Sequence, residues 1–445
     1  MKRLLAALLM LLTMTACTQQ AVISAPVPQV TEPPTATEPV TEPPTEAPTA
    51  PQPSPDAALY KADAEYLVAL VEETHPCFAL DDVPAEYAPA KEKLLSECEY
   101  AQDQAAFARL CQQYLVTLGD AHTLMYAVYA VKNRLDLTGL VEGDAFYITD
   151  TAGNLTGETL AAVNGVPITD LFALVDTHYV AENQAAREYN RRYYSLSEYF
   201  LELAGIDILN PICVTKEKDG VQETELIGRT DKPISRGASF VADSKILQDD
   251  VFYVDFNKCQ QCPQLDDVCA KLEKAVNGDI RKVIVDIRGN GGGTDPACRQ
   301  LLSAMGMKPP RSGQFMRWSP LTAPIYQITQ DYHLPADPSV AVTNPDVTLM
   351  VLVDQNTFSS ANLLATWVQD GKLGTIVGRP YRNSPTAYGS THSFTLPGTG
   401  LQGRVSTKRI YRPDETADQE TLWPDVQIGL GEDALEAALD LLKSK

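Results

Sequence analysis

Two adjacent serines stand where an apolar strand over residues 347–354 is expected to lead into a helix. At such a junction a serine hydroxyl is exposed at the edge of the sheet, and the first backbone NH groups of the helix can bind a developing oxyanion. Because serine is also a preferred N-cap residue, this segment by itself favours a structural role. If the segment is catalytic, we expect Ser359 to be the nucleophile, with Ser360 as the alternative.

A glycine-rich loop follows the strand predicted over residues 282–287. Its sequence, Arg-Gly-Asn-Gly-Gly-Gly at residues 288–293, leaves backbone NH groups unobstructed and is typical of an anion-binding concavity. A phosphate-binding loop would continue with Gly-Lys and then Ser or Thr, whereas Thr-Asp follows here. The loop therefore favours an oxyanion hole over a nucleotide site, and the expected backbone donors are Gly291 or Gly292 together with Ser360.

A serine nucleophile needs a neighbouring base, because its own ionisation at neutral pH is negligible and an imidazole can take the proton. His122 follows Gly119, which ends a predicted helix, in the segment Asp-Ala-His-Thr at residues 120–123. The other histidines of the five lack a comparable setting, and His392 is the reserve candidate because it stands near the predicted core. We expect His122 to be the general base.

Taken together, these segments resemble the tail-specific, or C-terminal processing, serine peptidase family. In that family a strand ends in Asp-Leu-Arg-Gly-Asn-Gly-Gly-Gly, and residues 286–293 match it with Ile287 in place of Leu. A later strand leads to a serine three residues before an acidic or amide position, here Ser359 and Asn362. The resemblance covers most of the folded chain and implies a crotonase- or ClpP-like α/β catalytic core.

The resemblance also bears on the remaining catalytic groups. One branch of the family uses a lysine base, and Ser384 occupies the matching position here. The tricorn-like branch uses Ser, His and Glu, and its Asp-Gly-His-Thr segment is matched at residues 120–123 except for Ala121. This branch implies an acid shortly before Pro-Asp at residues 424–425. Glu420 is the expected acid, and the alternatives are Asp418, Glu415 and Asp414, because Leu-Trp replaces the usual Gly-Val before Pro-Asp.

The N-terminus predicts export and lipid attachment. Two basic residues precede an apolar run over residues 4–12 that is too short to span a bilayer, and Thr-Ala-Cys follows, ending at Cys17. This resembles a lipobox, so residues 1–17 are predicted to be a lipoprotein signal peptide and Cys17 the lipidated residue. A plain secretory signal with an unmodified Cys17 is the alternative. The predicted location is the outer face of the bacterial cytoplasmic membrane or the cell envelope.

Residues 18–56 consist mainly of Pro, Thr, Ala and Glu without apolar periodicity, which predicts a disordered tether. The net charge of -22 argues against nucleic acid as a partner and against electrostatic binding to anionic lipid. Lipid must therefore supply the anchor. We expect no cofactor and no metal, because the Cys-X-X-Cys at residues 259–262 lacks a second close pair or clustered histidines.

The folded part is predicted to be α/β and to have three regions. Residues 57–126 carry apolar stripes at helical spacing and form an N-terminal helical region. Residues 127–236 contain short strand-like pieces and an Asn-Gly turn, and they resemble a PDZ domain. Residues 237–445 alternate apolar strands with amphipathic helices, which indicates a catalytic sheet covered on both faces.

The predicted function is that of a membrane-anchored extracytoplasmic serine endopeptidase that cleaves peptides or proteins by acylation of Ser359. The alternative is a catalytically inactive lipoprotein that binds peptides or other ligands on the same fold, as retinoid-binding relatives of the family do. The two differ in whether Ser359 reacts with an active-site probe.

Overall fold

The computed structural model describes residues 52–129, 133–232, 238–248 and 250–443. The predicted signal peptide, Cys17 and the tether as far as residue 51 lie outside these described residues. Within them, no helix has the length and apolar character needed to cross a membrane.

Three helices open the described chain: α1 (Ala57–Thr74), α2 (Tyr87–Glu97) and α3 (Gln104–Val116), joined through 3-10 turns at Pro76–Phe78 and Cys98–Tyr100. Helix α3 begins after Asp103, whose side chain accepts a hydrogen bond from the NH of Ala106, as expected of an N-cap. The apolar stripe of α3, including Phe107 and Leu115, is fully buried. The predicted N-terminal helical region is therefore confirmed.

The middle of the chain is built on an antiparallel sheet, with the strand order β3-β4-β5-β7-β8 and β6 paired with β5. The Asn-Gly turn at residues 164–165 joins β5 to β6, and both residues have positive φ. The resemblance of this region to PDZ domains stays a prediction. Its elements are β2 (Arg134–Leu135), β3 (Gly139–Glu142), β4 (Ala145–Thr149), β5 (Leu155–Val163), β6 (Val166–Pro167), α4 (Ile168–Asp176), α5 (Gln184–Tyr194), α6 (Glu198–Leu203), β7 (Ile212–Lys218), β8 (Val221–Ile227) and β9 (Arg229–Thr230), the last paired with β2.

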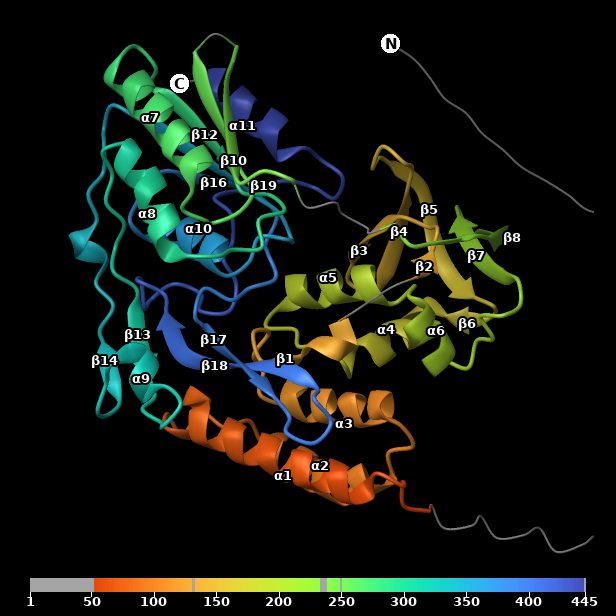
Figure 1. Ribbon diagram of the computed structural model, residues 1–445. Helices are drawn as coiled ribbons and strands as arrows, with labels where there is room; N and C mark the ends of the chain where they lie inside the picture. Colours follow the sequence, from red (N-terminus) through yellow and green to blue (C-terminus); the bar gives the residue numbers. More distant parts are fainter. Residues whose placement is uncertain (1–51, 130–132, 233–237, 249, 444–445) are drawn as a thin grey trace, which may run out of the picture. The chain divides into compact units, whose positions relative to one another are not determined.

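The C-terminal part contains a six-stranded sheet in the order β10-β11-β12-β15-β16-β19, parallel from β11 to β19. Alternate residues of its strands face opposite sides, so Val283 and Val285 pack with α7, α8 and α10, whereas Ile284 packs with α11 (Figure 1). This confirms the predicted α/β core with a sheet covered on both faces. Its elements are β10 (Ala242–Leu247), β11 (Val251–Phe256), α7 (Pro263–Asn277), β12 (Lys282–Asp286), α8 (Asp295–Ala304), β15 (Thr348–Val353), α10 (Ser360–Asp370), β16 (Thr375–Gly378), β19 (Val426–Gln427) and α11 (Ala434–Lys443).

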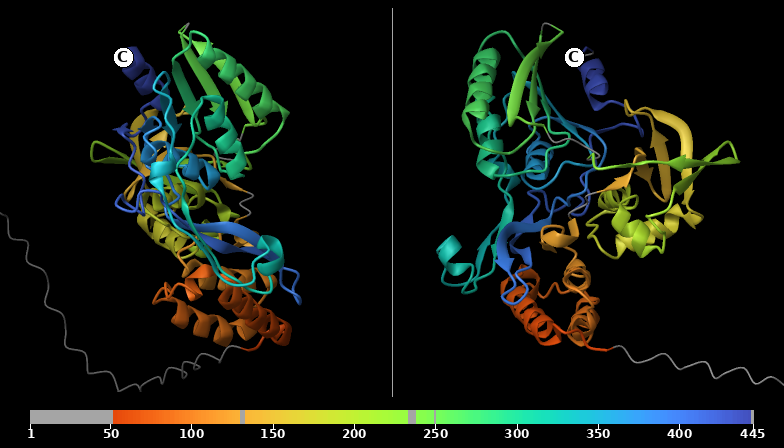
Figure 2. Two further views of the ribbon diagram at one scale, coloured as in Figure 1. Left: turned by 90° about the vertical axis from the view of Figure 1, so that its left-hand side faces the viewer. Right: turned by 45° about the vertical axis from the view of Figure 1, so that its right-hand side comes forward.

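A second sheet, which the sequence analysis did not predict, joins the N-terminal helices to the catalytic part. Strand β18 (Gln402–Tyr411) pairs with β1 (Leu124–Met125), β13 (Gly313–Met316) and β17 (Ala387–Thr395), and β14 (Tyr332–Leu334) extends β13. Phe394 and Val405 of this sheet share an apolar cluster with α1 and α3, and Figure 2 shows β17 and β18 beside these helices. The remaining short elements are 3-10 turns at Tyr126–Tyr129 and Pro338–Val340 and helix α9 (Ala323–Tyr326).

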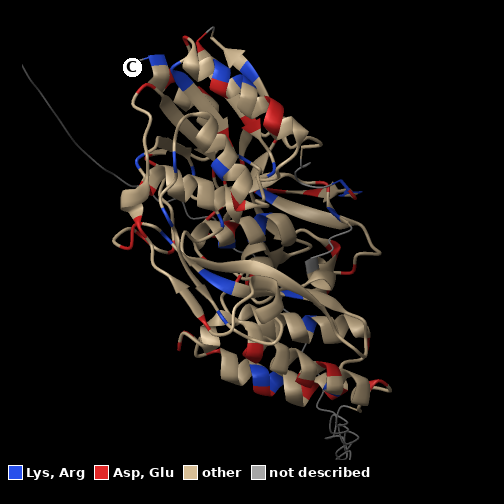
Figure 3. Ribbon diagram, turned by 60° about the vertical axis from the view of Figure 1, so that its left-hand side comes forward, with Lys and Arg blue, Asp and Glu red and all other residues tan. Residues whose placement is uncertain are grey.

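Charged side chains are distributed over all these elements. In the view of Figure 3, acidic and basic residues are interspersed along helices, strands and loops. The whole sequence nevertheless has 58 acidic against 36 basic residues and a formal net charge of -22.

Candidate active site

Ser359 lies where the sequence predicted it, between β15 and α10. Its backbone has φ 55° and ψ −124°, a region that residues other than glycine rarely adopt. The NH of Ser359 donates to Oδ1 of Asn383 at 2.8 Å, which holds this strained turn in place. The hydroxyl of Ser359 makes no hydrogen bond to any described residue and lines a cavity of about 470 Å³. A strained turn that holds a free hydroxyl at a helix N-terminus suits a nucleophile.

Ser360, the alternative nucleophile, has a different environment. Ser360 is 5% exposed, and its hydroxyl donates to Oδ1 of Asp295 at 2.9 Å. Asp295 begins α8, so this bond ties the start of α10 to the neighbouring helix. The hydroxyl of Ser360 is thus occupied by a structural bond, whereas that of Ser359 is free.

His122 lines the same cavity as Ser359. Its ring stacks on that of Phe358, the residue before the serine, with 4.5 Å between centroids and 26° between planes. Burial, above all, lowers the pKa of His122 to about 4, with the charges of Arg404 and Arg382 adding to the effect and Asp120 opposing it. The imidazole is therefore neutral at pH 7 and able to accept a proton.

Pairing between β1 and β18 carries His122 to this position. Leu124 of β1 lies opposite Arg404 of β18, and the Nε of Arg404 donates to the carbonyl of His122 at 2.9 Å. The hydroxyl of Thr123 accepts a hydrogen bond from the NH of Ser406 at 2.9 Å. The histidine segment is therefore an added edge of the second sheet, which explains how a residue of the N-terminal region reaches the catalytic core.

Asp120 is the carboxylate next to the imidazole. Its Oδ1 lies 3.8 Å from Nδ1 of His122, a nitrogen that is buried without a hydrogen-bond partner, and also accepts from the backbone NH of His122 at 2.8 Å. Its Oδ2 accepts hydrogen bonds from the hydroxyl of Thr123 and from Nε2 of His75, the latter at 3.2 Å. Burial disfavours the carboxylate, but the bond and charge of His75 outweigh burial and lower the pKa of Asp120. Asp120 is thus anionic beside the ring.

Glu182, in the loop between α4 and α5, is a half-buried acidic residue that the sequence analysis missed. It accepts hydrogen bonds from the NH of Ala121 at 3.1 Å, from Nδ2 of Asn383 at 2.7 Å and from the NH of Ser384 at 2.8 Å. Burial raises its pKa to about 7, with the charge of Asp120 adding to the rise and these hydrogen bonds opposing it. One carboxylate oxygen of Asp120, one of Glu182 and one ring nitrogen of His122 all lie within 4.8 Å of one another. No motif surrounds Glu182, so only the fold reveals it.

The structure does not bring the expected acid, Glu420, into this group. Glu420 is exposed, and its backbone carbonyl accepts a hydrogen bond from Asn183 at 3.1 Å. The loop is held by Arg412, which donates to the carbonyl of Asp418 and is paired with the buried Asp370. Among the described carboxylates, those grouped with His122 are Asp120 and Glu182, and they do not include the alternatives Asp418, Glu415 and Asp414.

The glycine loop packs directly against the serine turn. A Cβ atom on Gly292 would lie 2.7 Å from both the carbonyl oxygen of Phe358 and the Cβ of Ser359, so this position requires glycine. The NH of Gly292, an expected oxyanion donor, is bonded to Oδ1 of Asn290 at 2.8 Å. The NH groups of Gly291 and Ser360 have no partner in the described chain, so they remain the available donors.

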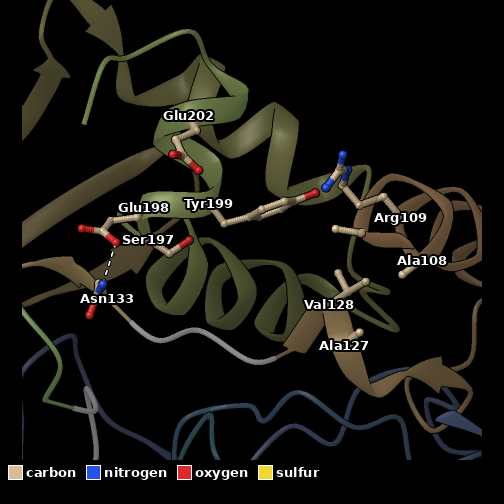
Figure 4. Close-up of a pocket in the computed structure, with 10 residues that line it drawn as sticks. Ala108, Arg109, Ala127, Val128, Asn133, Ser197, Glu198, Tyr199 and Glu202 are labelled. Atoms are coloured by element: carbon tan, nitrogen blue, oxygen red, sulfur yellow. Dashed lines mark hydrogen bonds between the residues drawn. The ribbon is translucent and has the colours of Figure 1, made fainter. Parts of the chain in front are cut away.

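A separate cavity of about 280 Å³ lies between α3 and α6. Figure 4 shows Tyr199 extending across it toward Arg109, while Asn133 donates to Glu198 at 2.7 Å. None of the expected catalytic residues lines this cavity. The candidate nucleophile and base, Ser359 and His122, line the other cavity.

Comparison with known proteins identifies the catalytic region. Residues 250–428 match Peptidase family S41. Among solved structures, mature CPAF is similar with a TM-score of 0.60 and 12% sequence identity, covering 87% of this chain and 96% of that one. Mature CPAF complexed with lactacystin gives the same TM-score and identity, covering 87% and 97%. The photosystem II D1 C-terminal processing protease has 15% identity and a TM-score of 0.45, covering 86% and 97%.

No curated protein sequence matches the chain. The similarity to CPAF, at its low identity, concerns the fold, and the family match covers the strands and helices that carry Ser359 and the glycine loop. The protein is therefore a serine-type peptidase whose residues 250–428 form a domain of peptidase family S41, the family of tail-specific peptidases.

Proposed function

We propose that the protein is an extracytoplasmic endopeptidase that cleaves peptides through acylation of Ser359, with His122 as the general base. The observation that carries this proposal is that the two side chains line one cavity, with the imidazole stacked on the residue before the serine. The free hydroxyl of Ser359 and the neutral state of His122 at pH 7 support these roles.

In the proposed reaction the Ser359 hydroxyl oxygen attacks the substrate carbonyl while His122 takes its proton. The NH groups of Ser360 and Gly291 receive the oxyanion, since both lack other partners among the described residues. His122 then protonates the leaving amine, which departs and leaves an ester on Ser359. Water, deprotonated by His122, hydrolyses this ester and releases the new carboxyl terminus.

Asp120 is the better candidate for the acid that orients His122. Its carboxylate oxygen lies 3.8 Å from Nδ1, too long for a hydrogen bond but within the reach of a small ring movement. Such closing on substrate binding is common, because catalytic hydrogen bonds are often loose in unliganded sites. Glu420 has no comparable contact.

The proposed location is the outer face of the bacterial cytoplasmic membrane or the cell envelope, with lipid on Cys17 as the anchor. The lipobox-like end of the signal segment supports this, and residues 18–56 would serve as the tether. We also propose that residues 127–236 act as a PDZ-like module for peptide segments outside the cavity.

A fluorophosphonate probe tests the catalytic proposal, because it phosphonylates only an activated serine. We expect labelling of the wild-type protein, no labelling of Ser359→Ala, and a loss of labelling rate of about a hundredfold or more in His122→Ala. Ser360→Ala is the matched control, since it removes a neighbouring hydroxyl but keeps the backbone NH, and it should still be labelled.

Persistence of labelling in Ser359→Ala would assign the nucleophile elsewhere. Absence of labelling in a folded wild-type protein would favour the binding lipoprotein instead. Circular dichroism of each variant provides the check on folding.

A further inference from the structure

We propose that the catalytic cavity selects substrates with a carboxylate next to the scissile bond, and that Arg382 and Arg404 bind this carboxylate. The inference rests on the proposed function, because it assigns a substrate class to the same cavity. We assign the carboxylate to an acidic side chain of the substrate, and the test below separates it from a C-terminal carboxylate.

Arg382 has no carboxylate partner. Its guanidinium carbon lies 4.2 Å from the ring centre of Tyr189 and 4.3 Å from that of Phe358, so aromatic rings contact the group. Its Nε is buried without a hydrogen-bond partner, and no ion pair or hydrogen bond of its side chain occurs among the described residues. Stacking occupies the faces of a guanidinium and leaves the in-plane NH donors available for a ligand.

Arg404 lines the cavity from β18 and has the same unpaired character. Its Nε donates to the carbonyl of His122, whereas its terminal NH groups have no partner in the part of the chain that the structure describes. The charges of both arginines act on His122, which indicates that they reach the site of reaction. Two cationic groups therefore border the position of the reacting bond.

The charge balance of the cavity favours an anion. Asp295 is the other charged residue that lines it, and one of its carboxylate oxygens is occupied by the hydroxyl of Ser360. The lining thus has two arginines against one carboxylate, in a chain whose net charge is -22. Three other arginines with low exposure have acidic partners, namely Arg191 with Asp144 and Asp176, Arg379 with Glu142, and Arg412 with Asp370, whereas the buried Arg134 has none among the described residues.

A substrate carboxylate would complete these unsatisfied groups, because guanidinium and carboxylate form paired, charge-assisted hydrogen bonds. The competing interpretation is structural: Arg382 could only join α5, which carries Tyr189, to the serine turn, which carries Phe358. A structural role predicts an equal loss for all substrates, whereas carboxylate binding predicts a loss confined to acidic ones.

The test uses the full chain and a series of internally quenched peptides that differ at one position at a time, with Glu or its neutral isostere Gln on either side of the cleaved bond. A second pair of peptides ends in a free acid or in an amide. We expect kcat/KM to favour the carboxylate at one position by at least about tenfold, the effect of one charge-assisted contact. A preference confined to the pair that ends in a free acid or an amide would overturn the assignment to a side chain.

The ratio of kcat/KM for the Glu peptide to that for the Gln peptide should fall close to one in Arg382→Gln and should decrease in Arg404→Gln. Arg382→Lys should retain part of this preference because the charge remains. Arg299→Gln is the matched control, since Arg299 also stacks on an aromatic ring, Trp367 at 4.3 Å, but lies outside the cavity lining. It should keep the wild-type ratio. A comparison of these kcat/KM ratios separates a change in selectivity from a general loss of activity.

A wild-type ratio near one in every arm would overturn the inference, as would an equal loss for acidic and neutral peptides in Arg382→Gln. The Ser359→Ala protein provides an independent reading, because binding of fluorescein-labelled Glu and Gln peptides, measured by anisotropy, needs no turnover. Equal binding of the Glu and Gln peptides to the Ser359→Ala protein would also refute the inference. Failure of the proposed function is distinct, because the wild type would then leave the fluorophosphonate probe unreacted.

Discussion

His122 is subject to opposing influences from neighbouring charges. The low-dielectric surroundings and two arginines favour the neutral imidazole, whereas Asp120, at 3.8 Å from Nδ1, favours the imidazolium. Burial and the two arginines outweigh Asp120 in the unliganded protein, so the imidazole of His122 is a weak base in the ground state. If Asp120 closes on the ring when substrate binds, the protonated form becomes more favourable at the step that needs it.

The pH dependence of activity should report this balance. Because the pKa of His122 is lowered to about 4, kcat/KM should remain substantial at pH 5 and fall to zero as the pH drops through about 4. Asp120→Asn should lower kcat by about a hundredfold or more, because the imidazolium loses its counter-charge. Steady-state rates from pH 3 to 8 at constant ionic strength test both, and a limb near the ordinary histidine value of 6.5 that persists in Glu182→Gln would contradict the first.

Acid unfolding must be separated from this limb. Between the ordinary pKa of 6.5 and the folded value of about 4, the unfolded chain binds a proton at His122 that the folded chain does not. The free energy of unfolding therefore decreases as the pH falls through this window. Circular dichroism at each pH shows whether the loss of rate precedes the loss of structure.

At the scale of elements, Glu182 joins three segments that must act together. Its carboxylate accepts from the histidine segment through Ala121 and from the segment after β16 through Asn383 and Ser384. Asn383 in turn accepts the NH of Ser359 at 2.8 Å. A loop between α4 and α5 thus fixes the position of the base relative to the nucleophile.

Glu182→Gln should therefore lower kcat by about ten- to a hundredfold, the range expected when a buried hydrogen bond to a charged group is lost. Because burial raises the pKa of Glu182 to about 7, the wild-type pH profile should carry a partial step there, and the variant should lack it. Glu188→Gln is the matched control: Glu188 is buried and accepts from Gln355 at 3.0 Å, but it does not contact the histidine segment. An equal effect of both substitutions on kcat would indicate a merely structural role.

The elements that sequence patterns predicted well are those with strong local signals. The strands of the α/β core are continuous apolar runs such as residues 347–353, and α3 has a clear stripe and an aspartate N-cap. The second sheet was missed because β18 is mostly polar and has no continuous apolar run, and because its pairing with β1 joins distant segments. Glu182 was missed for the same reason, since its partners come together only in the fold.

At the scale of the molecule, the catalytic group depends on the convergence of all the described regions. His122, the proposed base, comes from the segment after α3, Ser359, the proposed nucleophile, from the α/β core, and Glu182 from the region between them. The glycine motif revealed the core because a single loop carries it, whereas the carboxylates expected shortly before residues 424–425 are not among the described residues grouped with His122. Local motifs thus identified the nucleophile and base candidates, and the fold identified the carboxylates around them.

Attachment to the membrane should depend on lipid alone. The net charge of -22 opposes binding to anionic lipid headgroups. Each buried acyl CH₂ contributes about 0.8 kcal/mol, so the several chains expected on Cys17 would be sufficient.

In a bacterial host, Cys17→Ser should move the full chain from the detergent phase to the aqueous phase of a Triton X-114 separation and abolish palmitate incorporation. Cys262→Ser, which alters a partly exposed cysteine of the folded region, should leave both unchanged. Retention of Cys17→Ser with the membrane after a high-salt wash would mean that the anchor lies elsewhere.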